Sequence, residues 1–338
     1  MFHSRLTNID PILKITSQNN NFTPIDFCEP MQKELNLANI RLEYPVHTIS
    51  KKLLVPAGAT LDEEILNSLR ANNQNNDKYP LIRIMLHDTL MDDFFKIIET
   101  SAHYSVIFSD KKSVKSMLEI ITDIEVPAPI ISYLEYFKIH EYYTYRHILL
   151  VFTLSTLLAM DLIKDKIKII EASIAGPTHD FGKLTVPLSI LTKDTPLTAK
   201  EKSHLEHHSI AGFILLTYYF QKTNHFPGLV ALQHHERRDG SGYPLGIFLD
   251  NPMVEIVVAC DIYDALVSPR PYRPMSFDNR SALEEITRMA QQNKLSWDVV
   301  KALIAKNRKM QPHFQECSIS KETRGGIPEK NLYGKIIS

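Results

Sequence analysis

A largely apolar run without any charged residue, at residues 148–160, limits most strongly what this chain can fold into. Its 13 residues are fewer than the roughly 18 to 20 that a helix needs to cross a bilayer. We therefore expect a buried helix at residues 147–161 and no membrane span. Within the run, apolar side chains recur at helical spacing: Leu150, Val151, Leu154 and Leu158.

Helical signals dominate after a proline-containing junction at residues 125–129. A capping box, Thr198 followed by Glu201, predicts one helix through about Tyr219. Further helices are expected at residues 254–266 and 281–292. At roughly 150 residues per domain, the chain should hold about two domains. We predict an N-terminal regulatory or partner domain at residues 1–130, a helical domain at residues 131–308 and a C-terminal tail at residues 309–338.

The front part mixes strand and helix signals between polar loops. A strand is expected at residues 51–55, and Thr60 with Glu63 forms a capping-box pattern that opens a helix through about Arg70. Residues 81–85 read as another strand. We predict a small mixed α/β domain here, and its sequence shows no catalytic pattern.

Charge and cysteine content exclude several classes of protein. The chain has 38 Lys+Arg against 39 Asp+Glu, a net charge of -1, so it lacks the basic surface of a protein that binds nucleic-acid polymers. Its 3 cysteines are far apart, which argues against a disulfide framework or a thiolate metal site. The N-terminus has no basic-then-apolar signal, and we expect a cytoplasmic protein.

Histidines and aspartates cluster in the second half of the chain. Five histidines and two aspartates are too many for one ion but suit two ions with a bridging aspartate: His147, His179, Asp180, His208, His234, His235 and Asp261. Two such ions suit phosphoester hydrolysis, because they share a hydroxide and stabilise charge on the phosphoryl oxygens. His204 and His207 share the predicted helix of His208, and we expect both to be exposed.

The segment HHERRDGSGYP at residues 234–244 joins two histidines to Asp-Gly and Ser-Gly turn signals. It resembles the signature of the HD-GYP family. HDFGK at residues 179–183 resembles the family's HD-x-G-K pattern, and Thr198, His208 and Gly212 resemble its LT…H…G segment. YTYRH at residues 143–147, DIYDAL at residues 261–266 and RPYR at residues 270–273 complete the resemblance, which runs from about residue 135 to about 305.

This resemblance implies a mainly α fold, an all-helical HD-type bundle with a two-metal site. It implies seven ligands to two divalent ions, Fe or Mn, with Asp180 bridging them: His147, His179, Asp180, His208, His234, His235 and Asp261. It further implies that Lys183 touches the scissile phosphate or its leaving group. Tyr243, Arg270 and Arg273 would help to hold the substrate, since an arginine fork suits phosphates.

The implied activity is hydrolysis of cyclic di-GMP by a metal-bridging hydroxide to linear pGpG, or on to GMP, in bacterial signalling. Family members with a third metal carry a glutamate four residues before the first histidine. Here that residue is Tyr143, with Glu141 the nearest acid, so we expect a dinuclear site and pGpG as the product. Two alternatives stay open. One is a signalling protein that docks partners, such as GGDEF-type diguanylate cyclases, through the GYP loop. The other is a hydrolase of another nucleotide. The oligomeric state stays open as well.

Overall fold

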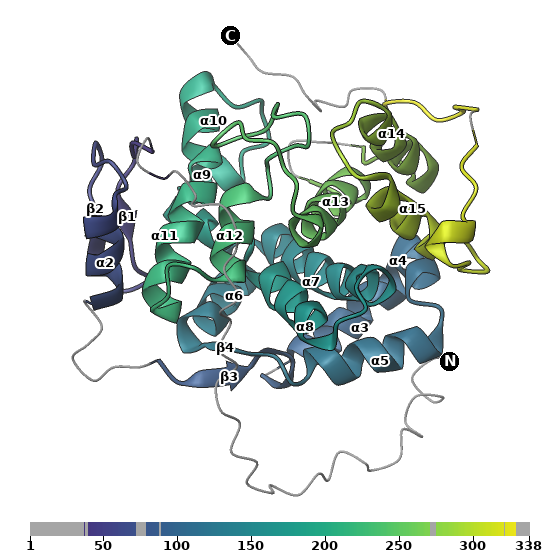
Figure 1. Cartoon of the computed structure of the whole chain (residues 1–338), viewed down its shortest axis with the longest axis horizontal. Coiled ribbons are helices and arrows are strands. Elements are labelled where there is room, and N and C mark those ends of the chain that lie inside the picture. The colour runs from purple at the N-terminus through teal and green to yellow at the C-terminus, as the bar shows by residue number, and fades with distance from the viewer. Residues whose placement is uncertain are drawn as a thin grey trace, which may run out of the picture. The chain divides into compact units, whose positions relative to one another are not determined.

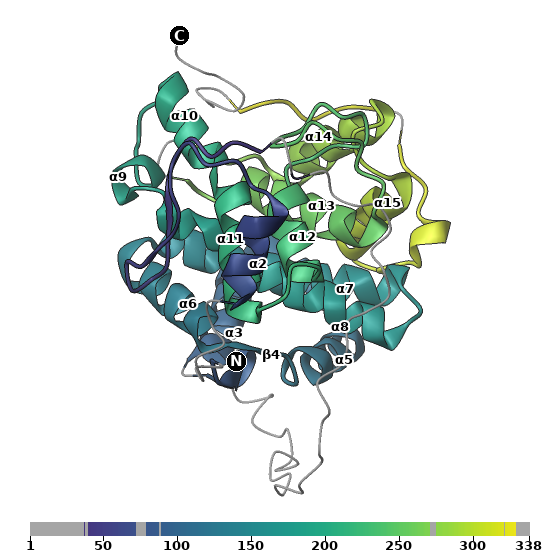
Figure 2. The same ribbon diagram turned by 60° about the vertical axis from the view of Figure 1, so that its left-hand side comes forward.

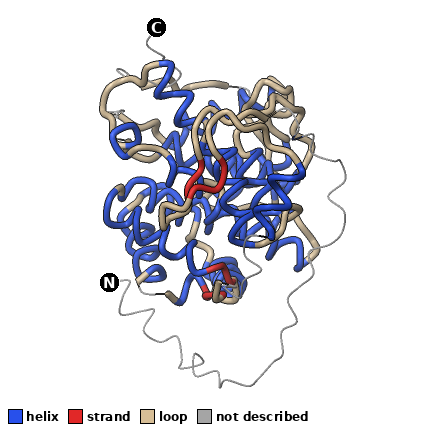
Figure 3. The backbone as a smooth tube through the Cα atoms, turned by 90° about the vertical axis from the view of Figure 1, so that its left-hand side faces the viewer, coloured by secondary structure: helices blue, strands red, loops and turns tan. Residues whose placement is uncertain are grey.

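The structure is a computed structural model that describes residues 37, 40–71, 79–87, 89–270, 275–320 and 322–328. Helices make up most of the regular structure of this part, and strands occur in it as two antiparallel pairs (Figure 3). One pair joins β1 (Val46–His47) to β2 (Leu53–Val55), and the other joins β3 (Leu81–Arg83) to β4 (Glu125–Pro127). The predicted class, a mainly α bundle preceded by a smaller mixed part, is confirmed.

Helix α7 (Tyr142–Leu162) lies at the centre of the bundle (Figure 1). Every side chain from residue 147 to residue 159 is buried, as expected for a helix that is apolar on all sides. Of the described helices it alone has the length and apolarity of a membrane span, but most of it is buried inside the protein. It packs against α3 (Leu90–Thr100), α5 (Lys111–Ile121), α6 (Ala128–His140), α8 (Lys166–Ala175), α13 (Pro252–Val267) and α15 (Trp297–Lys306).

The front strand pair and α2 (Glu63–Ala71) pack against α11 (His208–Phe220), as Figure 2 shows for α2. The helix predicted after Thr60 is present, but Asp62 supplies its N-terminal hydrogen bond, to the Ile65 N–H at 2.8 Å. The strand expected at residues 81–85 stops at Arg83 because β4 offers three residues to pair with, and a 3₁₀ turn (Ile84–Leu86) follows.

The single helix predicted from Thr198 to about Tyr219 was wrong, because the chain breaks at His207 into α10 (Ala199–Glu206) and α11. The capping box of Thr198 and Glu201 is present at the start of α10. No residue of α10 is fully buried, whereas α11 is apolar and buried along most of its length. The turn lets α10 stay at the surface while α11 enters the core, and it places His208 at the first position of α11.

Short elements and the last helices complete the described part. They are α4 (Ala102–Ile107), 3₁₀ turns at Gly176–Thr178, Phe181–Thr185 and Phe314–Glu316, α9 (Leu188–Leu191), α12 (Phe226–Gln233) and α14 (Asn279–Gln291). The helices predicted at residues 254–266 and 281–292 correspond to α13 and α14. Beyond α15, the backbone N–H groups of Arg324 and Gly325 donate to Glu284, which attaches the end of the described chain to α14. Leu35–Ser338 group into one compact unit, and the predicted boundaries near residues 130 and 308 stay predictions.

Candidate metal centre

Six of the seven predicted ligands lie in two groups of three. His147 from α7, His179 after the 3₁₀ turn and Asp261 from α13 form the first group. His208 from the start of α11 forms the second group with His234 and His235, which directly follow α12. Within each group, one ligand atom from every residue lies within 4.8 Å of the other two. Each group therefore offers three donors to one ion.

Asp180, the seventh, lies between the two groups. Its Oδ2 atom is 3.5 Å from His147 Nε2 and 3.3 Å from His179 Nε2. Its Oδ1 atom is 3.4 Å from His208 Nε2 and 3.8 Å from His234 Nε2. One carboxylate thus turns one oxygen toward each group, which is the geometry that a bridging ligand needs.

The outer nitrogens of four histidines are held by acceptors. The Nδ1–H of His179 donates to the Gly176 carbonyl at 2.7 Å, that of His208 to the Leu205 carbonyl at 2.5 Å, and that of His234 to the Ala231 carbonyl at 2.9 Å. His147 Nδ1 lies 2.6 Å from the Asp264 carboxylate. Since none of these acceptors can donate while Asp264 is ionised, a proton sits on each Nδ1 and the Nε2 atoms face inward.

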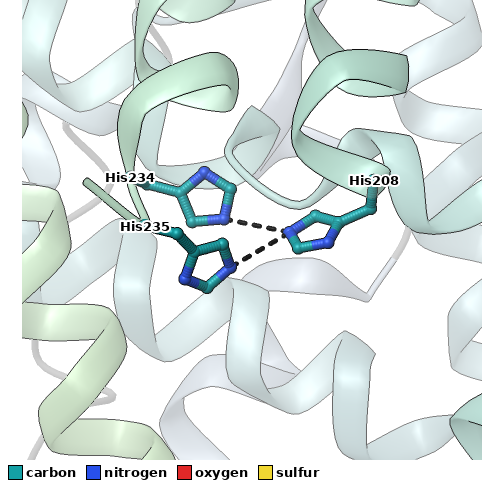
Figure 4. A group of neighbouring side chains, drawn as sticks. All are labelled: His208, His234 and His235. Carbon is teal, nitrogen blue, oxygen red and sulfur yellow. Dashed lines mark hydrogen bonds between the residues drawn. The ribbon is translucent and has the colours of Figure 1, made fainter. Parts of the chain in front are cut away.

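The inward nitrogens lie as close together as ligands of one ion do. His208 Nε2 is 3.1 Å from His234 Nε2 and 3.2 Å from His235 Nε2 (Figure 4). A metal–nitrogen distance of about 2.0–2.1 Å with angles near 90–110° puts neighbouring nitrogens about 2.8–3.4 Å apart. Because the lone pairs of His208 and His234 repel each other at this distance, the group fits a cation at its centre.

Burial sets the charge of the candidate ligands. It lowers the pKa of His208 to about 4 and that of His234 to about 3, so both are neutral near pH 7. Neutral imidazole is the form that binds a metal. Burial alone would raise the pKa of Asp180, but the neighbouring Lys183 holds that pKa well below its ordinary value. In the first group, burial lowers the pKa of His147, but the hydrogen bonds to Asp261 and Asp264 outweigh it and raise that pKa above its ordinary value. The second group thus offers neutral imidazoles and Asp180 an ionised carboxylate, a kind of donor set that suits Fe, Mn or Zn better than Mg or Ca.

Two glycines let the ligand-bearing segments meet. Gly182, two residues after Asp180, lies directly on the start of α11, and a Cβ there would stand 1.8 Å from the His208 carbonyl oxygen. Gly212, one turn along α11, faces Gly182 from the other side. Because neither carries a side chain, the segment that holds Asp180 approaches the helix that holds His208 closely enough to share one centre.

The loop at residues 234–246 folds back on its own histidines. A Cβ on Gly242 would stand 2.4 Å from the Cα of Glu236, so glycine allows this close return. The buried Glu236 carboxylate accepts from the Leu245 N–H at 2.7 Å, and burial raises its pKa. The result places the Tyr243 ring against His235, with centroids 4.5 Å apart and planes 20° apart.

Among the residues expected to act on substrate, Lys183 lies at the centre, with its Nζ 2.6 Å from Asp180 Oδ2. Arg270 reaches the outer side of the first group, with Nη2 3.3 Å from His147 Nδ1 and 3.9 Å from Asp264. Arg273 lies outside the described residues. Tyr243 borders the second group through its stacking on His235.

The expectation that His204 and His207 are exposed was wrong. His207 is 5% exposed. His204 is half-buried and stacks on Tyr44, with ring centroids 3.8 Å apart. The segment before β1 covers this face of α10, since the Tyr44 hydroxyl also donates to the Lys200 carbonyl at 3.2 Å. Sequence reasoning did not foresee this cover, because it joins residues about 160 positions apart.

Asp264 and Glu236 are functional residues that sequence reasoning missed. Asp264 holds the outer nitrogen of His147, and Glu236 shapes the loop beside His235. A signal for Asp264 was present, because it lies three residues after Asp261 and one helical turn places both carboxylates on the same face of α13.

Comparison with known proteins gives the following similarities. The family model of the HD domain matches residues 132–298. A cyclic di-GMP phosphodiesterase response regulator of Xanthomonas campestris is 40% identical over 116 residues, 34% of this chain and 30% of that protein. A cyclic di-GMP phosphodiesterase of Pseudomonas aeruginosa is 37% identical over 158 residues, 46% of this chain and 37% of that protein. A 3'3'-cGAMP-specific phosphodiesterase of Vibrio cholerae is 35% identical over 101 residues, 29% of this chain and 19% of that protein. The chain spans well under half the length of these curated relatives.

Proposed function

This chain carries an HD domain of the HD-GYP kind over residues 132–298, and from that premise we propose that it hydrolyses cyclic di-GMP to linear pGpG. The observation that carries the proposal is the position of Asp180, with one oxygen toward each of two three-ligand groups. Two divalent ions held about 3.5–4 Å apart lower the pKa of a shared water and stabilise charge on a phosphoryl group. Cyclic di-GMP is the substrate in the names of two of the relatives described above.

The seven side chains divide this work. His147, His179 and Asp261 would hold one ion, while His208, His234 and His235 would hold the other. Asp180 would bridge both, and its negative charge would offset the repulsion between the two ions. The donor set of imidazoles and carboxylates supports Fe or Mn, although affinity order alone does not select between metals.

Lys183 is placed to act on the reacting phosphate. Its ammonium group contacts Asp180 at 2.6 Å, and its side chain is 14% exposed. In the complex we propose that it turns toward the non-bridging oxygens or the leaving oxygen and stabilises the charge that develops there. Tyr243, stacked on His235, would form a wall for a base of the substrate. Arg270 and Arg273 would hold the phosphates.

The residues before His147 support pGpG as the proposed product. Tyr143 stands where a third-metal ligand would be, and it is 43% exposed. The Glu141 carboxylate accepts from the Tyr143 and Thr144 N–H groups at 3.2 and 2.7 Å, so it caps α7. With two ions, we expect the second hydrolysis step, which would give GMP, to be slow.

The other assignments are proposals of the same kind. Residues 1–130 would form a regulatory or partner domain, residues 131–308 the phosphodiesterase domain and residues 309–338 a tail, in a cytoplasmic protein. A second substrate, 3'3'-cGAMP, is favoured by one relative that is named for it. A docking role for the loop at residues 234–246, with GGDEF-type diguanylate cyclases as partners, is the alternative if turnover is slight.

The test is hydrolysis by the full chain, purified without oxygen and loaded with Fe or Mn. Cyclic di-GMP and 3'3'-cGAMP are assayed side by side, the products are separated by chromatography, and the metal content is counted. We expect pGpG from the parent protein, with about two ions per chain, and no turnover from Asp180→Ala. Faster turnover of 3'3'-cGAMP than of cyclic di-GMP would make 3'3'-cGAMP the assigned substrate. Two bound ions without any turnover would favour the docking role, and mostly GMP would contradict the product.

A further inference from the structure

A buried carboxylate behind the first ligand group is bound from several sides. Asp264 is fully buried, and its Oδ2 atom is 2.6 Å from His147 Nδ1. Its Oδ1 atom accepts hydrogen bonds from the Tyr104 hydroxyl at 2.7 Å and from the Ser268 hydroxyl at 2.5 Å. Arg146 adds a positive charge 3.7 Å away. These contacts keep the carboxylate ionised and fix its orientation.

The orientation of Asp264 decides what His147 can do. With its Nδ1–H bound to Asp264, His147 turns its Nε2 atom inward, 3.1 Å from Asp261 and 3.5 Å from Asp180. If Asp264 rotated, the imidazole would lose the acceptor that fixes its tautomer and its angle. Carboxylates that hold a metal-binding histidine in this way typically contribute 10–100-fold to metal affinity or activity.

One partner of Asp264 comes from outside the HD domain. Tyr104 lies on α4, before residue 132, whereas Arg146, Ser268 and His147 all lie within residues 132–298. The Tyr104 side chain is fully buried, and the Arg146 guanidinium lies 5.9 Å from its ring centroid. The end of α4 is held as well, because the Gln311 amide donates to the Val106 and Ile107 carbonyls at 2.9 and 3.0 Å.

We propose that Tyr104 is a positioning residue of the metal centre: its hydroxyl holds Asp264, Asp264 holds His147, and the first ion site loses affinity when that hydroxyl is removed. The proposal rests on the proposed two-metal centre and adds a contribution from the segment that precedes the HD domain. It also couples that segment to the metal centre, since a shift of α4 would move the Tyr104 hydroxyl and so change the position of Asp264 and His147.

The test is Mn²⁺ binding to the metal-free full chain, followed by calorimetry and by electron paramagnetic resonance. In Tyr104→Phe we expect one of the two sites to bind about tenfold more weakly, with the other unchanged. Tyr263→Phe is the matched control. It removes a buried hydroxyl whose bonds go to Asn279 and Asn307, at 2.8 and 2.9 Å, from a ring that contacts Tyr104. The control should bind both ions as the parent does.

Two further readings separate positioning from general structural damage. Turnover lost in Tyr104→Phe at low Mn²⁺ should return at high Mn²⁺, because the defect is in affinity. If Tyr104→Phe does not fold, Ser268→Ala removes the other hydroxyl on the same oxygen and should weaken the same site.

Unchanged Mn²⁺ affinity in the variant, or equal weakening of both sites, would overturn the proposal, as would an equal loss in Tyr263→Phe. A parent chain that binds no Mn²⁺ would overturn both the metal centre and this inference. A parent that binds two ions without hydrolysing any cyclic dinucleotide would overturn the proposed function alone, since the binding comparison uses no nucleotide.

Discussion

Replacing Gly182 with alanine should separate the two halves of the metal centre. An added Cβ would stand 1.8 Å from the His208 carbonyl oxygen and 2.5 Å from the Gly212 nitrogen. Both obstacles are backbone atoms of α11, so no side-chain rotation can relieve the contact. Ordinary van der Waals contact begins at 3.4 Å, so the segment and the helix must move about 1.6 Å apart, or the local backbone must deform by a similar amount.

This displacement is far larger than a shared ion tolerates. Ligand distances in metal sites hold to within about 0.2 Å, and Asp180 now lies 3.4 Å from His208 Nε2. Moving the two apart by more than 1 Å, on the scale estimated above, would leave Asp180 with the first group only. Overpacking of this kind costs about 3 kcal/mol, at the upper end of its usual range. For a unit of this size, that lowers Tm by roughly 5–10 °C.

The assay is thermal unfolding together with the Mn²⁺ content per chain, measured on a graded series. Gly182→Ala should lose stability and retain about one ion at most. Gly212→Ala should have a Tm and an ion content between those of Gly182→Ala and the control, since its Cβ would meet the Ala231 Cβ at 3.2 Å. Gly326→Ala is the neutral control, because nothing lies within 4 Å of its Cβ. A Gly182→Ala protein that has the same Tm as the Gly326→Ala control and binds two ions would refute this reasoning.

Two further changes test charge near and far from the centre. Lys183→Met should reduce turnover about 10²–10³-fold with the metal content unchanged, if the ammonium group stabilises the reacting phosphate; loss of metal instead would assign Lys183 to holding Asp180. His225 caps α12 by accepting the Gly228 N–H at 3.2 Å, and burial lowers its pKa from 6.5 to about 3. Since the unfolded chain binds this proton and the native protein does not, stability is lost as pH falls from 6.5 toward 3, by about 1.4 kcal/mol per pH unit. His225→Asn keeps a capping acceptor, so urea unfolding of the metal-free chain should show a loss between pH 7 and pH 5 that is about 2 kcal/mol smaller than in the parent, and equal losses would contradict this.

Local features of the fold could be predicted from the sequence because local rules decide them. The apolar run at residues 148–160 is the core of α7, and the capping box at Thr198 starts α10. The chain break at His207 could not be predicted in the same way. It depends on the neighbours of the two halves, since α10 keeps contact with solvent and α11 enters the core. The helical spacing of apolar residues in the sequence shows no interruption at such a turn, so it does not predict the break.

The seven candidate ligands were found by their resemblance to a motif set, and the structure brings them together. Asp264 was missed although its spacing from Asp261 places both carboxylates on one helix face. Tyr104 could not be found, because its contact with Asp264 joins residues 160 positions apart. The roles of Tyr243, Arg270 and Arg273 toward substrate stay predictions, since they depend on a bound molecule. Sequence reasoning thus identified the candidate metal ligands but missed the residues that orient them through hydrogen bonds.

The glycines of the motifs, together with Glu236, explain why the candidate metal ligands lie close together. Gly182 gives the Asp180 segment its approach to α11, and Gly242 lets the loop return to Glu236. Neither glycine can bind an ion, yet each sets the distance between residues that can. The motif therefore has two physical parts: side chains with the right donor atoms, and positions without side chains where backbone must meet backbone. A chain that kept every histidine but lost Gly182 would keep the donors of the centre and lose its geometry, which is why the alanine series tests the site more sharply than the removal of any one histidine.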